Sequence, residues 1–483
     1  MIEMKNILML ILLVVGFACE DALNEIPKNF ISPENYYQTA EDATGAIHAA
    51  YQSNLVNISK YAIDEVYTDY FYTKGSWAPM ANLAQPLDAT STGRANGLWN
   101  RDYTIINRSN VVLGRVPDIE MDETEKSRIL AEAHFLRAWA YLDLVRKYGP
   151  VPLRVTETRD LSNVAVGRSP VSDVYDQIES DLLIAEQDLP SDVGANTGRA
   201  TRWAAKMILA DVYMDLEQWQ DAADRADEII NSGVYDLVTV DDSADFYNIF
   251  ATETSVEDIF SSHFSQTTRT WDVAVRWAHL SNTPHWNVGV GYNVIYANTN
   301  SSLLNNWDNN DLRKGFNLYT GFYRDGEWVS NPAITPLLFK KYIVDENALA
   351  TYSVPMIRYP EAFLIYAEAA NRVNDGPTAL ALERLNVIRR RAYGHDPYSV
   401  SPDDFPAGMD RQAFEDTVIR ERAYEFMLEG KRYWDLRRKD MWEDLILQDK
   451  GMVVDESRKL HPIPQPEIDN NPALTPGDQN PGF

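Results

Sequence analysis

Cysteine is almost absent from this chain of 483 residues, which contains one, Cys19. A single cysteine excludes internal disulfides and zinc sites built from cysteine ligands. Basic residues are scarce relative to acidic ones, and the formal net charge is -28. A field of that sign repels nucleic-acid phosphates and anionic membrane surfaces, and it favours neutral over polyanionic ligands. Beyond the N-terminal segment, no apolar run approaches the length of a membrane span.

The N-terminal segment has the pattern of a secretory signal peptide. Lys5 precedes the apolar run Ile7–Ala18, which is too short for a transmembrane anchor. Its end, Val15-Gly-Phe-Ala-Cys19, resembles a bacterial lipobox, in which the cysteine is acylated and becomes the first residue of the mature protein. We therefore predict a signal peptide at 1–18 and a lipid-anchored tether at 19–38. The alternative is a cytoplasmic protein with an apolar start and one buried thiol.

Motifs of common enzymes are also missing. The seven histidines are dispersed, without a His-Glu-x-x-His zinc motif, and no nucleophile elbow is present. Gly289-Val-Gly291 lacks the third glycine of a dinucleotide-binding loop. Glu421, Glu425 and Glu429 share one helical face, as an acid/base pair of a glycoside hydrolase would require. Neighbouring arginines and lysines favour ion pairing instead, so we predict no catalytic residues and no cofactor.

One short acidic segment has a weak similarity to a calcium loop. Asp308-Asn-Asn-Asp311 supplies several oxygen ligands, but Leu312 occupies a position that needs an oxygen, and the distant glutamate is missing. We therefore predict no metal site.

Helical periodicity dominates the rest of the chain. The clearest unit is Thr201–Ile230, where two helices have small residues at their crossing and large ones outside, as in a tetratricopeptide (TPR) repeat. A weaker copy runs from Glu361 to Arg391. Other predicted helices are 39–51, with a Thr39/Asp42 capping box, 98–112, 123–148 and one beginning at Ser169–Pro170. We predict a mostly α-helical globule of TPR-like helix pairs stacked into one superhelix.

Three segments lack this periodicity. Residues 61–98 mix aromatics with turn residues and are predicted to form a long loop region. Residues 233–355 are predicted to be a loop-rich insertion with short strands such as Ile259–Phe264, and five of the 12 tryptophans lie between 271 and 328. The tail from 461 to 483 contains six prolines and is predicted to be extended rather than helical.

Segments along nearly the whole chain resemble the SusD/RagB family of outer-membrane nutrient-binding lipoproteins of Bacteroidetes. They include Ala131-Glu-Ala-His-Phe-Leu-Arg-Ala-Trp-Ala-Tyr141 and Glu421-Arg-Ala-Tyr-Glu-Phe-Met-Leu-Glu-Gly-Lys-Arg-Tyr-Trp-Asp-Leu-Arg437. The other matching segments are Cys19 with Asp21–Pro27, Leu98–Asn110, Tyr148–Pro152, Thr201–Tyr213, Arg358–Ala369, Leu460–Ile468 and Gln479–Phe483.

The resemblance implies a non-catalytic, lipid-anchored protein at the outer-membrane surface. It implies that the protein captures oligosaccharides or other polymers and caps a SusC-like TonB-dependent transporter. The alternatives are a TPR scaffold that binds only protein and a surface glycoside hydrolase. Within one SusD-like globule, we expect an N-terminal helical part at 39–232, the insertion at 233–355 and a C-terminal helical part with its tail at 356–483.

Exposed aromatic side chains beside polar groups are the expected sugar-binding residues, because sugar C–H faces pack on aromatic rings and hydroxyls need polar partners. Aromatics in glycine-rich, non-periodic segments are the best candidates, since no helix packing requires them. The predicted ligand-binding residues are Trp77, Trp286, Tyr72, Tyr292, Trp271, Trp277 and Arg276. The tryptophans predicted to lie in the core are Trp99, Trp139, Trp203, Trp219 and Trp434.

Overall fold

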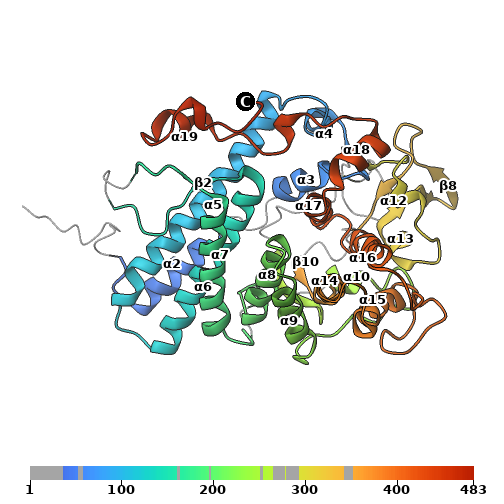
Figure 1. Ribbon diagram of the computed structural model, residues 1–483, viewed down its shortest axis with the longest axis horizontal. Coiled ribbons are helices and arrows are strands. Elements are labelled where there is room, and N and C mark those ends of the chain that lie inside the picture. The colour runs from blue at the N-terminus through green and yellow to red at the C-terminus, as the bar shows by residue number, and fades with distance from the viewer. Residues whose placement is uncertain are drawn as a thin grey trace, which may run out of the picture.

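The computed structural model describes residues 36–52, 58–159, 164–194, 197–250, 254–264, 278, 293–341 and 352–483. Helices make up most of this structure (Figure 1). The longer ones are α2 (Ala40–Tyr51), α3 (Ile58–Val66), α5 (Ala89–Arg115), α6 (Glu123–Tyr148), α7 (Val171–Asp188), α8 (Arg202–Asp215), α9 (Trp219–Ile230), α14 (Pro360–Val373), α15 (Ala379–Ala392), α16 (Arg411–Glu425), α17 (Arg432–Arg438) and α18 (Trp442–Lys450). The predicted mostly helical fold is confirmed.

The remaining elements are short. The short helices are α4 (Ala78–Ala81), α10 (Tyr247–Phe250), α12 (Ser302–Asn305), α13 (Leu312–Asn317) and α19 (Gln465–Asn470). The strands pair antiparallel, two by two: β1 (Phe71–Thr73) with β5 (Ile295–Ala297), β2 (Val151–Pro152) with β3 (Arg168–Ser169), β4 (Asp258–Phe264) with β10 (Tyr352–Arg358), β6 (Leu318–Tyr319) with β9 (Leu338–Phe339), and β7 (Gly321–Arg324) with β8 (Glu327–Ser330). Among the described residues, these ladders do not join into a larger sheet.

The predicted helix pairs are present. In the first pair, the Thr201 hydroxyl accepts a hydrogen bond from the Ala204 N–H at 3.3 Å and begins α8. Ala222, Ala223 and Ala226 on α9 are buried, and such small side chains let neighbouring helices approach closely. Helix α9 packs on α8 and also on α14, which pairs in turn with α15 (Figure 1). The predicted strand at 259–264 is confirmed as β4.

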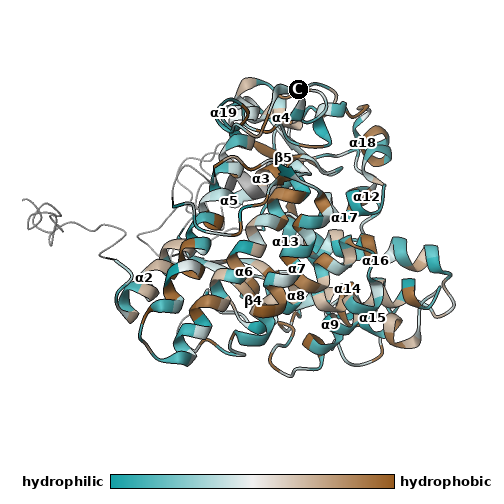
Figure 2. Ribbon diagram, turned by 60° about the vertical axis from the view of Figure 1, so that its left-hand side comes forward, coloured by the Kyte–Doolittle hydropathy of each residue, from teal (hydrophilic) through white to brown (hydrophobic). Residues whose placement is uncertain are grey.

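Two hydrophobic cores hold the fold together. The larger lies among α2, α5 to α9 and α14 to α16, whose ribbons carry both hydrophobic and hydrophilic residues (Figure 2). The second joins α3, β1 and α4 to β5, α12, α17 and α18. In it, the Tyr433 ring lies 4.9 Å from that of Tyr67 and 5.2 Å from that of Trp442. The Trp442 indole N–H also donates to the Tyr67 carbonyl at 2.6 Å. The second core therefore joins the N-terminal part of the chain, just after α3, to the C-terminal helix α18.

Two predictions about irregular segments are wrong. Residues 61–98 are not one long loop, because they include most of α3, and α5 begins at Ala89. Gly93 and Gly97 weaken the helical signal there, whereas the Asp88 carboxylate caps the helix by accepting from the Ser91 N–H at 2.7 Å. The proline-rich tail contains helix α19, in which Pro466 occupies the first turn, where no intrahelical N–H is needed.

Several predictions concern residues outside the described part of the chain. The signal peptide, Cys19 and nearly all of the tether lie before residue 36. Of the helices that the structure describes, none combines the length and the hydropathy needed to span a bilayer.

Candidate functional site

The predicted aromatic site is described only in part. Tyr72 and Trp77 lie in the described structure. Trp271, Arg276, Trp277, Trp286 and Tyr292 lie outside the described residues. The structure therefore describes the N-terminal part of the predicted site, and it describes the chain again from Asn293, directly after Tyr292.

The β1–β5 ladder joins these two halves. Tyr72 and Tyr296 are directly opposite each other, and their half-buried rings stack with centroids 5.6 Å apart and an interplanar angle of 25°. The Lys74 N–H donates to the Val294 carbonyl at 2.8 Å and extends the ladder. The chain that emerges directly after Tyr292 thus lies against the segment that leads to Trp77.

A lysine from the C-terminal part of the chain adjoins this aromatic pair. The Lys450 ammonium nitrogen lies 4.8 Å from the centre of the Tyr72 ring and donates to the Phe71 carbonyl at 2.9 Å. Burial lowers the pKa of Lys450 to about 7, against the attraction of Asp69 and Asp449. Burial also raises the pKa of Tyr72. The ladder therefore combines two aromatic rings with an N–H donor, which suits a ring-shaped, hydroxyl-bearing ligand.

Trp77 is deeply set rather than exposed. Its side chain belongs to the second core, with 7% of the residue exposed. The Arg94 guanidinium covers the indole at 4.0 Å from the ring centre and donates to the Ser76 carbonyl at 2.9 Å. A ligand approaching here meets guanidinium N–H groups above an indole, a stack that can donate to sugar hydroxyls. The sequence pattern did not single out Arg94, which lies on α5 within 61–98, or Lys450, which comes from the C-terminal part of the chain.

The three glutamates predicted to share one helical face are structural, and Glu429 lies in the turn after α16, which ends at Glu425, rather than on that helix. Glu421 pairs with Arg313 at 2.6 Å, Glu425 pairs with Arg358 at 3.0 Å, and all three glutamates are buried. Burial favours the neutral form of Glu425, but Arg391, Arg358 and Arg313 outweigh it and hold its pKa well below the usual range. Arginine and lysine partners likewise lower the pKa of Glu429 against its burial. A carboxylate held ionised in this way cannot act as a general acid. The predicted ion pairing is present, but the partners are Arg313, Arg358, Arg391 and Lys341 from other segments rather than the neighbouring arginines and lysines.

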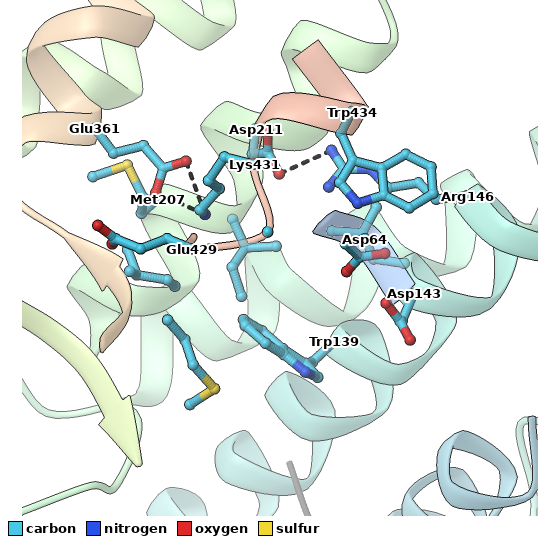
Figure 3. Close-up of a pocket in the computed structure, with 15 residues that line it drawn as sticks. Asp64, Trp139, Asp143, Arg146, Met207, Asp211, Glu361, Glu429, Lys431 and Trp434 are labelled. Carbon is cyan, nitrogen blue, oxygen red and sulfur yellow. Dashed lines mark hydrogen bonds and ion pairs between the residues drawn. The ribbon is translucent and has the colours of Figure 1, made fainter. Parts of the chain in front are cut away.

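A small cavity of about 80 Å³ lies between the N-terminal and C-terminal helices (Figure 3). Trp139 on α6 and Trp434 on α17 border it on different sides. Both were predicted to lie in the core, but both are only partly buried. Four of its charged side chains pair with one another: Lys431 with Glu361 at 2.9 Å and Arg146 with Asp211 at 2.8 Å. The cavity holds a few waters at most by its volume, and its ion pairs fasten the helices that surround it.

The remaining tryptophans predicted to be in the core differ in their burial. Trp99 is buried, whereas Trp203 and Trp219 are half-buried at the edge of the larger core. The acidic segment before α13 also forms internal contacts. Asp311 pairs with Arg313 at 2.6 Å, and Asp308 accepts from the Tyr393 hydroxyl at 3.1 Å. In the parts of the chain that the structure covers, no three His, Cys, Asp or Glu side chains gather as metal ligands would.

Comparison with protein families gives two matches that together cover most of the chain. Residues 285–483 match the family described as "SusD family". Residues 25–214 match the family described as "Starch-binding associating with outer membrane".

Full-length relatives agree with these matches. A "SusD-like protein P2" of Formosa agariphila is 26% identical over 515 residues, covering 99% of both chains. Among solved structures, a SusD homolog from Bacteroides thetaiotaomicron superposes with a TM-score of 0.78 at 23% identity, covering 93% of this chain and 98% of that one. Surface glycan-binding protein A from the same organism, in complex with laminarihexaose, gives a TM-score of 0.71 at 21% identity, covering 92% and 100%. The chain belongs to the SusD/RagB family.

Proposed function

We propose that this chain is a cell-surface lipoprotein that binds oligosaccharide or polysaccharide nutrients and delivers them to a SusC-like TonB-dependent transporter. The observation that carries the proposal is the stacked Tyr72–Tyr296 pair, which lies half-buried beside Lys450. Membership of the SusD/RagB family and the fold shared with a laminarihexaose-bound protein support it. The net charge of -28 favours a neutral glycan.

The proposed ligand site centres on the β1–β5 ladder. Tyr72 would stack on sugar rings, and Arg94 would present N–H donors above Trp77. We propose that Trp286 and Tyr292 complete the site, because Tyr292 is joined directly to the chain that pairs with β1. Trp271, Arg276 and Trp277 are further candidates in the same insertion. Each good stacking ring contributes about 0.5–1.5 kcal/mol beyond burial, so one substitution weakens binding and two nearly abolish it.

The lipid anchor is the second part of the proposal. Acylation of Cys19 would hold the protein at the outer-membrane surface, and the family description that matches residues 25–214 names an association with that membrane. Replacing Cys19 by alanine should leave the protein soluble or mislocalised, as measured by cell fractionation. Recovery of the Cys19→Ala variant in the outer-membrane fraction would contradict the anchor.

The same geometry supports binding without catalysis. Glu421, Glu425 and Glu429, the carboxylates that best fitted a hydrolase, are buried in ion pairs with arginine and lysine. A protein-only scaffold is the remaining alternative, since the α8–α9 and α14–α15 pairs are of the kind that bind proteins. That alternative leaves the stacked, half-buried Tyr72–Tyr296 pair without a role.

Affinity electrophoresis tests the proposal. The purified protein is run through gels that contain laminarin, soluble starch, xylan or galactomannan, and the expected result is retardation by at least one of them. No retardation by any of these polymers would contradict glycan binding, and release of reducing sugar would support the hydrolase. Co-purification of a large TonB-dependent barrel in gentle detergent is expected, and its absence would count against the transporter.

A further inference from the structure

The β7–β8 hairpin presents an aromatic pair to solvent. Tyr323 and Trp328 lie directly opposite each other and are 61% and 51% exposed. Their ring centroids are 5.1 Å apart at an interplanar angle of 70°. An antiparallel ladder with one face on the core ordinarily turns polar side chains outward. This ladder instead turns outward the two residue types that most often form binding surfaces.

The hairpin is built to hold this pair in place. Its turn, Asp325-Gly326, has φ angles of 52° and 85°, the left-handed pair that a tight two-residue turn requires. On the inner face, Phe322 is buried and packs with Tyr319 and Leu338. The outward rings are therefore mounted on an anchored ladder rather than on a loose loop.

The absence of a side chain at Gly321 leaves room for the Trp328 indole. A Cβ atom at this position would lie 2.5 Å from the Val329 carbonyl oxygen, 2.6 Å from Cζ2 of Trp328 and 2.8 Å from Cε2 of Trp328. The Trp328 ring thus occupies the space that any other residue at 321 would fill with its side chain. Held against the backbone on one side, the ring is preorganised, which lowers the entropy cost of stacking on a ligand.

The hairpin also adjoins the proposed glycan site. Tyr296, whose ring stacks on Tyr72, packs against the cluster formed by Tyr319, Phe322 and Leu338 beneath the hairpin. We propose that Trp328 and Tyr323 form a second sugar-binding platform, which takes a further neutral sugar unit of a polysaccharide chain bound at the Tyr72–Tyr296 ladder. This inference rests on the proposed function and adds that the protein selects long chains over short ones.

The size and setting of the pair favour a sugar over a protein partner. Two rings are far smaller than the roughly 800 Å² that each partner buries in a standard protein interface. Asp325, in the turn next to the rings, is exposed and offers acceptors for sugar hydroxyls. Arg324 and Glu327 alternate to the other face of the ladder, where the Arg324 guanidinium lies 5.3 Å from the centre of the Phe322 ring. The net charge of -28 disfavours an anionic polymer.

Calorimetric titration of three variants tests the platform. Trp328→Ala with Tyr323→Ala removes both rings, and Gly321→Ala crowds both the indole and the Val329 carbonyl. Tyr398→Ala, the control, removes an aromatic residue elsewhere that is 57% exposed. The probes are whichever of laminarin, soluble starch, xylan and galactomannan retards the wild type, and the trisaccharide of that polymer. We expect the double variant to lose at least about fivefold in affinity for the polymer and nothing for the trisaccharide. Gly321→Ala should show a smaller loss, and Tyr398→Ala none.

The other outcomes are separable. Unchanged polymer affinity in the double variant overturns the platform while leaving the proposed function in place. Equal losses for polymer and trisaccharide overturn it as well, because they place the hairpin inside the first site or reveal a folding defect. Loss of transporter co-purification with polymer affinity intact identifies a protein docking site instead. A wild type that binds none of the polymers refutes the proposed function and the platform together.

A second measurement observes the platform in the wild-type protein. With 5-fluorotryptophan incorporated, the Trp328 resonance is assigned by its disappearance in Trp328→Phe. It should shift when the polymer is added to wild-type protein and stay in place when the trisaccharide is added. A Trp328 resonance that is unmoved by a saturating amount of bound polymer would overturn the platform.

Discussion

Replacing Glu425 by glutamine should destabilise the protein strongly. The Glu425 side chain is buried and accepts hydrogen bonds from Arg358 at 3.0 Å and from Arg391 at 2.5 Å. A hydrogen bond to a charged group contributes about 1.5–3 kcal/mol, and breaking a buried ion pair by removing one partner costs about 3–5 kcal/mol. In the variant, Arg358 and Arg391 both keep Glu257 as a second partner. We therefore expect the free energy of unfolding to fall by about 3 kcal/mol, the lower end of the range for a broken buried ion pair.

Urea denaturation followed by circular dichroism measures this loss. The matched control is Asp375→Asn, which breaks a pair with Arg411 at 2.8 Å whose side chains are 86% and 43% exposed. Such an exposed pair contributes less than about 1 kcal/mol. If Glu425→Gln is no more destabilising than the control, the buried ion pairs of Glu425 with Arg358 and Arg391 do not stabilise the fold. A variant that is stable but has lost a sugar-releasing activity of the wild type would revive the hydrolase.

Two further predictions concern stability. His461 is buried against Tyr67 and Tyr148, and burial, with Lys147 and Arg458 nearby, lowers its pKa to about 3. In the unfolded chain, His461 takes up a proton near pH 6.5, whereas in the folded protein it stays neutral down to about pH 3. The contribution of neutral His461 to the free energy of unfolding is therefore complete above pH 6.5 and is lost as the pH falls towards 3. His461→Gln should flatten the pH dependence of the unfolding free energy in this window, and an unchanged slope would contradict the burial argument. Thr39→Ala removes the cap of α2, in which the Thr39 hydroxyl accepts from the Asp42 N–H at 3.2 Å. It should lower the unfolding free energy by about 1 kcal/mol in a urea titration, and no change would show that this cap is dispensable.

Sequence alone predicted the helices whose own residues determine them. Helix α6 spans 123–148 as predicted, because Asp122 caps its start and Gly149, with φ of 69°, ends it before Pro150. The start of α5 was missed since its first turns are poor in helix-forming residues, and the helix there depends on the Asp88 cap.

The segments that carry the family resemblance meet in the interior. Residues from 131–141, 358–369 and 421–437 surround the cavity between the helices and supply much of its ion-pair network. This placement explains why those segments identify the fold and say little about the ligand.

The arrangement of the site could not be predicted from the sequence. Tyr72 and Tyr296 stack because of a strand register that joins segments more than 200 residues apart, and Lys450 comes from a third segment. Likewise, the sequence indicated an aromatic insertion, but the pairing of β7 with β8 decides that Trp328 faces outward and Phe322 inward.

The most direct test of glycan binding at the β1–β5 ladder is calorimetric titration of a Tyr72→Ala, Trp286→Ala double variant. The titrant is the trisaccharide of the polymer that retards the wild type, and Tyr398→Ala serves as the control. We predict that the double variant loses nearly all binding while its circular dichroism spectrum and thermal unfolding stay close to those of the wild type. Equal affinity in the double variant and the control would place the glycan elsewhere and contradict the site.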